Sequence, residues 1–238
     1  MTTHTTQSPP AADPRPAWFA ALDRVSGLVR AVPADRPADP TPCDGFDVRT
    51  LMAHLVTTLR RPAAMAAGTD PMAAPLVSED VLDDPAAAYV REASALRAAW
   101  SGPAGDALLD RVHRLPFGEV PARVALAVYV NETLVHGWDL AVATGQDPEG
   151  DPEPATAALR TAQSFLPADR RGGPVPFGPV VEPRPQAGPT ERLANWSGRE
   201  SAGWVGGPPR RRGSPSCTAT PAPRHRAQAT GAISQAAR

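Results

Sequence analysis

The stretch PARVALAVYVNETLVHGWDLAVAT, residues 121–144, decides the fold that this sequence predicts. It begins with a proline, which the first turn of a helix tolerates, and it is followed by Gly145, the residue type favoured just past a helix end. Between these two signals the chain is apolar on nearly every side, which indicates a buried helix rather than one lying on a surface. The stretch therefore predicts a central helix from Pro121 to Thr144.

Three polar residues on this apolar helix require an explanation. Glu132 and His136 are four residues apart, so one helical turn stacks them on the same face, and Asp139 follows three residues later. A buried carboxylate or charged imidazole without a partner is costly, whereas a divalent cation satisfies a carboxylate and a neutral imidazole together. By spacing alone an exposed Glu–His pair is the commoner meaning, but the apolar surroundings favour a metal site.

Four further segments have apolar residues at three- and four-residue steps, the period of an amphipathic helix. They are Ala17–Val32, Val48–Ala67, Pro85–Trp100 and Glu153–Phe165. Asp47 can cap the second of them. Residues 102–121 are less regular, with 107–115 fitting either a short helix or a strand, and after Pro167 only a brief apolar turn at 193–196 remains. The fold class predicted is all-α.

The third metal ligand is predicted on the second helix. His54 lies on the apolar face of that helix, and facing helices of a bundle commonly build metal sites. Catalytic zinc takes three protein ligands and keeps an open position, so His54, Glu132 and His136 form the expected set. Asp139 is expected to accept a hydrogen bond from the second nitrogen of a metal-bound histidine. Zinc suits these nitrogen and oxygen donors best, although nickel, iron and manganese stay open.

The other histidines and the two cysteines are not expected at this site. His4, His113 and His225 have polar or Pro/Arg-rich neighbours, so solvated side chains are predicted for them. Cys43 and Cys217 are far apart in the sequence and are predicted to be free thiols.

Composition limits the partners and the location. The net charge of -1 gives no overall basic field for nucleic acid, and the seven arginines from Arg199 onward lack aromatic platforms, so specific nucleic-acid binding is not expected. The longest apolar run, Val124–Val130, is far shorter than the about twenty residues that span a bilayer. The first sixteen residues lack a signal-peptide core, which predicts a cytoplasmic protein without membrane contact.

The organisation predicted is one domain with two unstructured ends. Residues 1–16 are rich in Thr and Pro and are expected to be disordered, and residues 17–204 form the domain. Residues 205–238 are Arg, Pro and Gly rich with almost no large apolar side chain, so they cannot bury enough surface to offset their ordering entropy.

Three segments together resemble a known family. They are PCDGFDVRTLMAH at 42–54, LPFGEVP at 115–121 and ETLVHGWDLAVATG at 132–145. In this order they resemble the DinB-like metal-binding family related to mycothiol-dependent maleylpyruvate isomerase, over about Ala17 to Trp204. The resemblance implies a four-helix bundle with an additional short helix and an irregular C-terminal segment. It also implies a metal held by a histidine of the second helix and by an acidic residue and a histidine of the fourth, positions that match His54, Glu132 and His136.

Two functions follow from the resemblance. The first is an enzyme, a monomer or homodimer, that uses the metal to activate a low-molecular-weight thiol such as mycothiol, for isomerisation of an electrophilic substrate or S-transfer onto it. A bound cation favours the thiolate, which is the nucleophile. The alternative is a metal-binding protein without turnover, acting in stress response or through a partner. The sequence contains no clear signature for the sugar portion of such a thiol.

Overall fold

The computed structural model describes residues 12–116, 118–172, 177–207 and 210. Apart from one two-stranded hairpin, the elements of regular secondary structure in this part are helices, so the all-α prediction is confirmed. None of its helices is long and apolar enough to cross a membrane. The longer elements are α1 (Arg15–Arg30), α2 (Val48–Ala67), α3 (Pro85–Ala99), α5 (Ala122–Thr144) and α6 (Pro152–Phe165).

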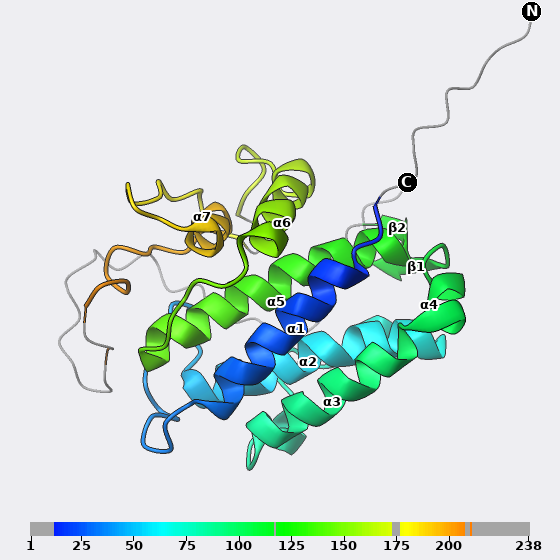
Figure 1. The fold of residues 1–238 in the computed structure, drawn as a ribbon, viewed down its shortest axis with the longest axis horizontal. Coiled ribbons are helices and arrows are strands. Elements are labelled where there is room, and N and C mark those ends of the chain that lie inside the picture. The colour runs from blue at the N-terminus through cyan, green and yellow to red at the C-terminus, as the bar shows by residue number, and fades with distance from the viewer. Residues whose placement is uncertain (1–11, 117, 173–176, 208–209, 211–238) are drawn as a thin grey trace, which may run out of the picture.

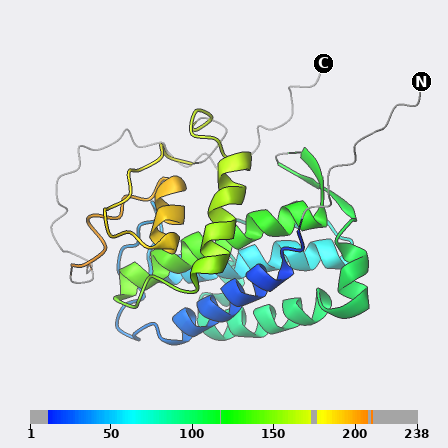
Figure 2. The same ribbon diagram turned by 45° about the horizontal axis from the view of Figure 1, so that its top comes forward.

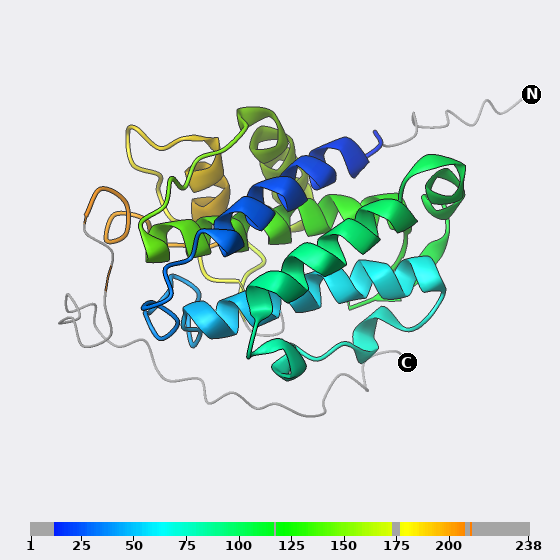
Figure 3. The same ribbon diagram turned by 60° about the horizontal axis from the view of Figure 1, so that its bottom comes forward.

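Helices α1, α2, α3 and α5 form a four-helix bundle (Figure 1). Each contacts two neighbours, in the cyclic order α1, α5, α2, α3. Helices α1 and α5 run in one direction and α2 and α3 in the other, so the link between α2 and α3 must return along the bundle. Figure 3 shows this link beside α2, with the short 3-10 turns Pro71–Ala73 and Glu79–Val81 in it.

The helix ends follow from capping residues. The Asp47 carboxylate accepts the backbone N–H of Thr50 at 2.8 Å and so begins α2, as predicted. Gly145, at φ 75°, ends α5 in the left-handed conformation. Helix α1 begins at Arg15 and not at Ala17. Backbone N–H groups in the first turn have no partner within a helix, so the proline in this turn costs no hydrogen bond. Of the N-terminal segment predicted to be disordered, residues 15 and 16 are thus helical, and residues 1–11 lie outside the described part.

Helix α5 is the centre of the molecule because it contacts α1, α2, α6 and α7. Every residue from Thr133 to Thr144 is buried, which explains the apolar pattern on all sides. Gly137 allows α1 to approach closely, since a Cβ atom there would lie 2.8 Å from a methyl group of Val25.

Residues 102–121, which fitted either a helix or a strand, contain both. Helix α4 (Gly102–Leu108) is followed by strands β1 (Val112–Leu115) and β2 (Gly118–Pro121), which pair in antiparallel register. The prediction that His113 is solvated is wrong. Alternate residues of a strand face opposite sides, and His113 is on the buried side of β1 between two exposed residues. Burial, followed by the charge of Arg111, lowers the pKa of His113.

Helices α6 and α7 (Pro189–Trp196) pack on α5 and contact each other (Figure 2). The apolar turn predicted at 193–196 is therefore the end of a longer helix. The Glu149 carboxylate accepts the backbone N–H groups of Thr190 and Glu191, at 2.9 Å each, and so caps the start of α7. Of the tail predicted to be disordered, residues 208–209 and 211–238 lie outside the described part.

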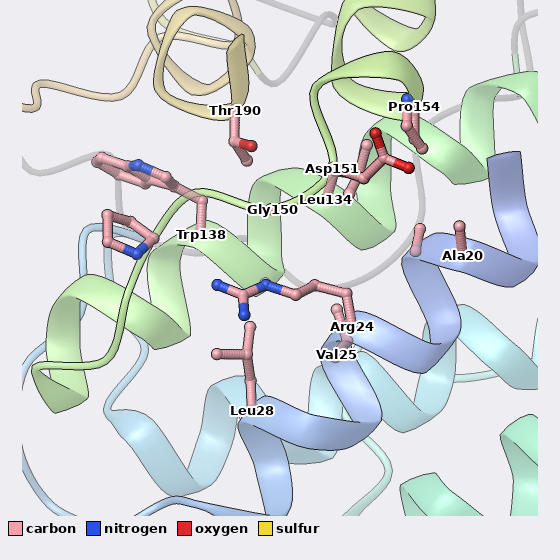
Figure 4. A pocket seen from close by; sticks show the side chains of 13 residues that line it. Ala20, Arg24, Val25, Leu28, Leu134, Trp138, Gly150, Asp151, Pro154 and Thr190 are labelled. Carbon is pink, nitrogen blue, oxygen red and sulfur yellow. The ribbon is translucent and has the colours of Figure 1, made fainter. Parts of the chain in front are cut away.

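A small cavity separates α1 and α5 from the start of α6 (Figure 4). The Arg24 side chain runs along it and donates hydrogen bonds to the backbone carbonyls of Asp147 and Glu149. The volume of the cavity, about 40 Å³, gives room for about three water molecules. This cavity is therefore too small for an organic substrate.

Candidate metal centre

The three predicted ligands meet where α2 faces α5. His54 comes from the middle of α2, and Glu132 and His136 from successive turns of α5. Their donor atoms all lie within 4.8 Å of one another. The two imidazole rings are 4.7 Å apart between centroids and nearly perpendicular, at 81°. The structure thus brings together the residues that the sequence singled out.

Hydrogen bonds fix the tautomer of both histidines. Nδ1 of His54 lies 2.6 Å from the backbone carbonyl of Leu76, and Nδ1 of His136 lies 3.1 Å from Oδ2 of Asp139. A carbonyl or carboxylate oxygen only accepts, so each Nδ1 must donate. The lone pair of a neutral ring is then on Nε2, the atom that remains for a metal. Asp139 therefore lies where the sequence predicted it, behind His136.

The spacing of the donors fits a small divalent ion. Nε2 of His136 and Oε2 of Glu132 are 3.4 Å apart, beyond the usual hydrogen-bond range. Two ligands at about 2.05 Å from a tetrahedral zinc ion are themselves about 3.3 Å apart. Two neutral imidazoles and one carboxylate are also a ligand set that catalytic zinc uses. The residues present therefore fit the metal that the resemblance implies.

The charges of the site are strongly coupled. Burial disfavours the charged form of His136, but the hydrogen bond to Asp139 and the nearby Cys43 and Glu132 outweigh it and hold the pKa of His136 well above its ordinary value. Burial, followed by the charge of His136, lowers the pKa of His54 to about 4. The pKa of Glu132 is lowered although burial opposes this, because the nearby imidazole of His136 favours the charged carboxylate. The site thus requires positive charge between its carboxylates, which a proton or a cation can provide.

Arg199 is a part of the site that the sequence did not predict. It holds Asp139 through two hydrogen bonds of 2.9 Å, one to each carboxylate oxygen. Burial opposes ionisation of Asp139, whose side chain is 0% exposed, and the charge of Arg199 lowers its pKa nevertheless. The preceding Gly198 has φ 91° and approaches the backbone of Gly178 so closely that a Cβ atom would lie 3.0 Å from it. The backbone conformation of the segment after α7 therefore places Arg199 beside Asp139.

Cys43 also lies at the site, although no role there was predicted for it. Its sulfur is grouped with donor atoms of His136 and Asp139, all within 4.8 Å, and its thiol is free. It does not belong to the group formed by the three predicted ligands. Cys217, for which a free thiol was predicted, lies outside the described residues.

A cavity of about 470 Å³ opens onto the three donors. This volume is within the about 300–1,000 Å³ that is typical of small-molecule sites. The Glu132 side chain is 27% exposed, whereas His136 is 9% exposed, so the carboxylate is the most accessible side of the cluster. The walls come from α2, α5, the loops on both sides of α2, the hairpin and the segments at 177–178 and 198–199. A ligand in this cavity can reach the donor atoms directly.

Comparisons with known proteins identify the family of this chain. Residues 18–141, which include the three donors and Asp139, match the family model described as the mycothiol maleylpyruvate isomerase N-terminal domain. The chain belongs to this family. Two uncharacterized proteins of Mycobacterium tuberculosis, from strains CDC 1551 / Oshkosh and ATCC 25618 / H37Rv, are each 32% identical to it over 191 residues, 79% of this chain and 98% of the relative. No solved structure matches the chain.

Proposed function

We propose that this protein binds a divalent metal ion, zinc, through His54, Glu132 and His136, and uses it with a mycothiol-type thiol to isomerise an electrophilic substrate or transfer the thiol onto it. The observation that carries the proposal is the pair of histidines whose Nδ1 atoms are both occupied by fixed acceptors. This leaves both Nε2 atoms for a ligand beside the Glu132 carboxylate. Membership in the family of the mycothiol maleylpyruvate isomerase N-terminal domain supports mycothiol as the thiol.

A cation held by these donors would lower the pKa of a thiol bound to it and so would supply a nucleophilic thiolate. The protein's own residues prepare the site for it. The Leu76 carbonyl and the Asp139 carboxylate orient the two imidazoles, and Arg199 keeps Asp139 ionised. The three-residue donor set leaves a side open to the cavity of about 470 Å³, from which a thiol can approach the donor atoms.

The first test is the metal content of the purified full chain beside His54→Ala and His136→Ala variants. His113→Ala is the matched control, because His113 is a buried histidine outside the site. We expect one equivalent of metal in the wild type and the control, and a loss in both site variants. Equal metal content in all four proteins would exclude the site.

The second test concerns turnover. Mycothiol and maleylpyruvate are incubated with the metal-loaded protein, and the loss of each is followed. We expect loss of maleylpyruvate that depends on mycothiol and stops after chelation and in Glu132→Gln. Isomerisation leaves the amount of mycothiol unchanged, whereas S-transfer lowers it as well. If metal binds but neither maleylpyruvate nor any other electrophile is converted in the presence of a thiol, the protein is a metal binder without turnover.

A further inference from the structure

The cavity at the three donors is lined by an arginine, Arg61, that has no partner among the residues that the structure describes. Arg61 lies seven residues after His54 on α2, so both lie on the same side of the helix, and both line the cavity. Nε of Arg61 is buried, and its guanidinium forms no hydrogen bond or ion pair within the described residues. The adjacent Arg60 is fully engaged, at 2.8 Å from Asp80 and 3.0 Å from Glu92. A guanidinium partly withdrawn from water without a counterion is costly, so Arg61 requires another explanation.

Tyr129 provides a second polar group at this end of the cavity. Burial raises the pKa of its hydroxyl to about 12, the charge of Arg61 lowers it and the charge of Glu132 raises it. The hydroxyl therefore lies within the influence of both groups, and it is protonated at neutral pH. It can donate a hydrogen bond, and it makes none to the residues that the structure describes. The remaining walls here are apolar, with Met72, Leu115 and Val128 among them.

We propose that Arg61 and Tyr129 form a carboxylate subsite for the substrate that reacts at the metal end. One unpaired arginine balances a single negative charge, which favours a carboxylate over a phosphate dianion. Glu132 occupies the other end and repels an anion from it, so the substrate's charged end is directed to Arg61. Seven residues of helix correspond to about 10 Å. A carboxylate held there can thus carry a reactive carbon several bonds away, near His54 and His136.

The subsite is tested first on the full chain with its metal removed by chelation, so that no metal can bind the probe. Benzoate and benzamide have the same shape and differ in charge. We expect the wild type to bind benzoate at least about tenfold more tightly than benzamide in a calorimetric titration, a preference that Arg61→Gln removes and the matched control Arg60→Gln retains. Arg61→Met, which keeps the apolar stem, should behave as Arg61→Gln. A preference that survives both Arg61 variants, or no preference in the wild type, would overturn the subsite.

The link to the reaction rests on the proposed function and has its own test. Mercaptoalkanoates of three to six carbons are compared with their amides on the metal-loaded protein. If the thiol and the carboxylate are held at opposite ends of one cavity, the advantage of the carboxylate peaks at one chain length and is lost in Arg61→Gln. An advantage that is the same at every length would contradict the link. Failure of thiol binding would count against the proposed function and leave the benzoate result unaffected.

Discussion

Asp139 accepts a hydrogen bond from Nδ1 of His136 at 3.1 Å, from a position with no exposure to solvent. This relationship selects which imidazole nitrogen is available to a metal. It also places a full negative charge inside the bundle, which Arg199 compensates. The orientation of His136, a proposed ligand, therefore depends on two residues that would not themselves touch the ion.

Replacing Asp139 by Asn removes the charge and nearly preserves the shape. We expect the dissociation constant for zinc to rise by about 10- to 100-fold, the usual effect of losing a partner behind a ligating histidine. Competition with a fluorescent chelator measures it. Asp110→Asn, in which an exposed carboxylate loses an arginine partner, is the control and should bind zinc as the wild type does. Equal affinities for all three proteins would show that Asp139 has no influence on the metal.

Cobalt(II) reports whether Cys43 closes the site. Since Cys43 is not grouped with the three predicted donors, we expect the cobalt-loaded wild type to lack the intense near-ultraviolet absorption of a cobalt–thiolate bond. That absorption should develop when an external thiol is added, in the wild type and in Cys43→Ser alike. If it is present before the addition and disappears in Cys43→Ser, then Cys43 is a fourth ligand.

Replacement by alanine should change the free energy of unfolding in opposite directions at two glycines that lie in helices. A Cβ atom at Gly137 meets the stiff, fully buried Val25, and overpacking of this kind costs about 1–3 kcal/mol, more than the up to about 1 kcal/mol gained in helix propensity. Gly27 of α1 has nothing within 4 Å of that position, so alanine there should raise the free energy of unfolding by about 0.5–1 kcal/mol. Urea denaturation of both variants measures the difference. Stabilisation by Gly137→Ala would contradict the close contact of α1 and α5.

The segment around α7 should be sensitive to acid. Burial raises the pKa of Glu191, but hydrogen bonds from Arg184 and Ser201 outweigh it, and the net pKa is lowered. A carboxyl group with a depressed pKa contributes stability above its unfolded-state pKa, and this is lost as the pH falls through the folded-state value. We expect the melting temperature of the wild type to fall more steeply than that of Glu191→Gln from pH 5 to about pH 3. Parallel profiles would rule out this contribution.

The sequence predicts the parts of the site that follow a helical period. Helix α5 has a proline at one end, a glycine at the other and a continuous apolar surface, and its four-residue spacing alone unites Glu132 with His136. The prediction that His54 joins this pair required only the assumption that its helix, α2, faces α5. Whether these residues hold a metal stays a prediction.

The residues of the site that the sequence did not predict lie in segments that have no helical periodicity. Arg199 and Cys43 lie in loops, where nothing in the spacing indicates which side chain turns inward. The buried charge of Asp139 was the available signal for Arg199, because such a charge needs a cation. His113 was assigned to solvent because its neighbours are polar, and the alternation of a strand only becomes visible once residues 112–115 are identified as one.

The pairing of Asp139 with Arg199 also bears on how this domain can be recombined. The family model ends at residue 141, yet the arginine that neutralises the centre of the bundle is contributed by a segment far beyond that boundary. A chimaera joined at the end of the matched region would inherit an uncompensated buried anion. The smallest unit that evolution or an engineer can exchange intact therefore extends at least to Arg199.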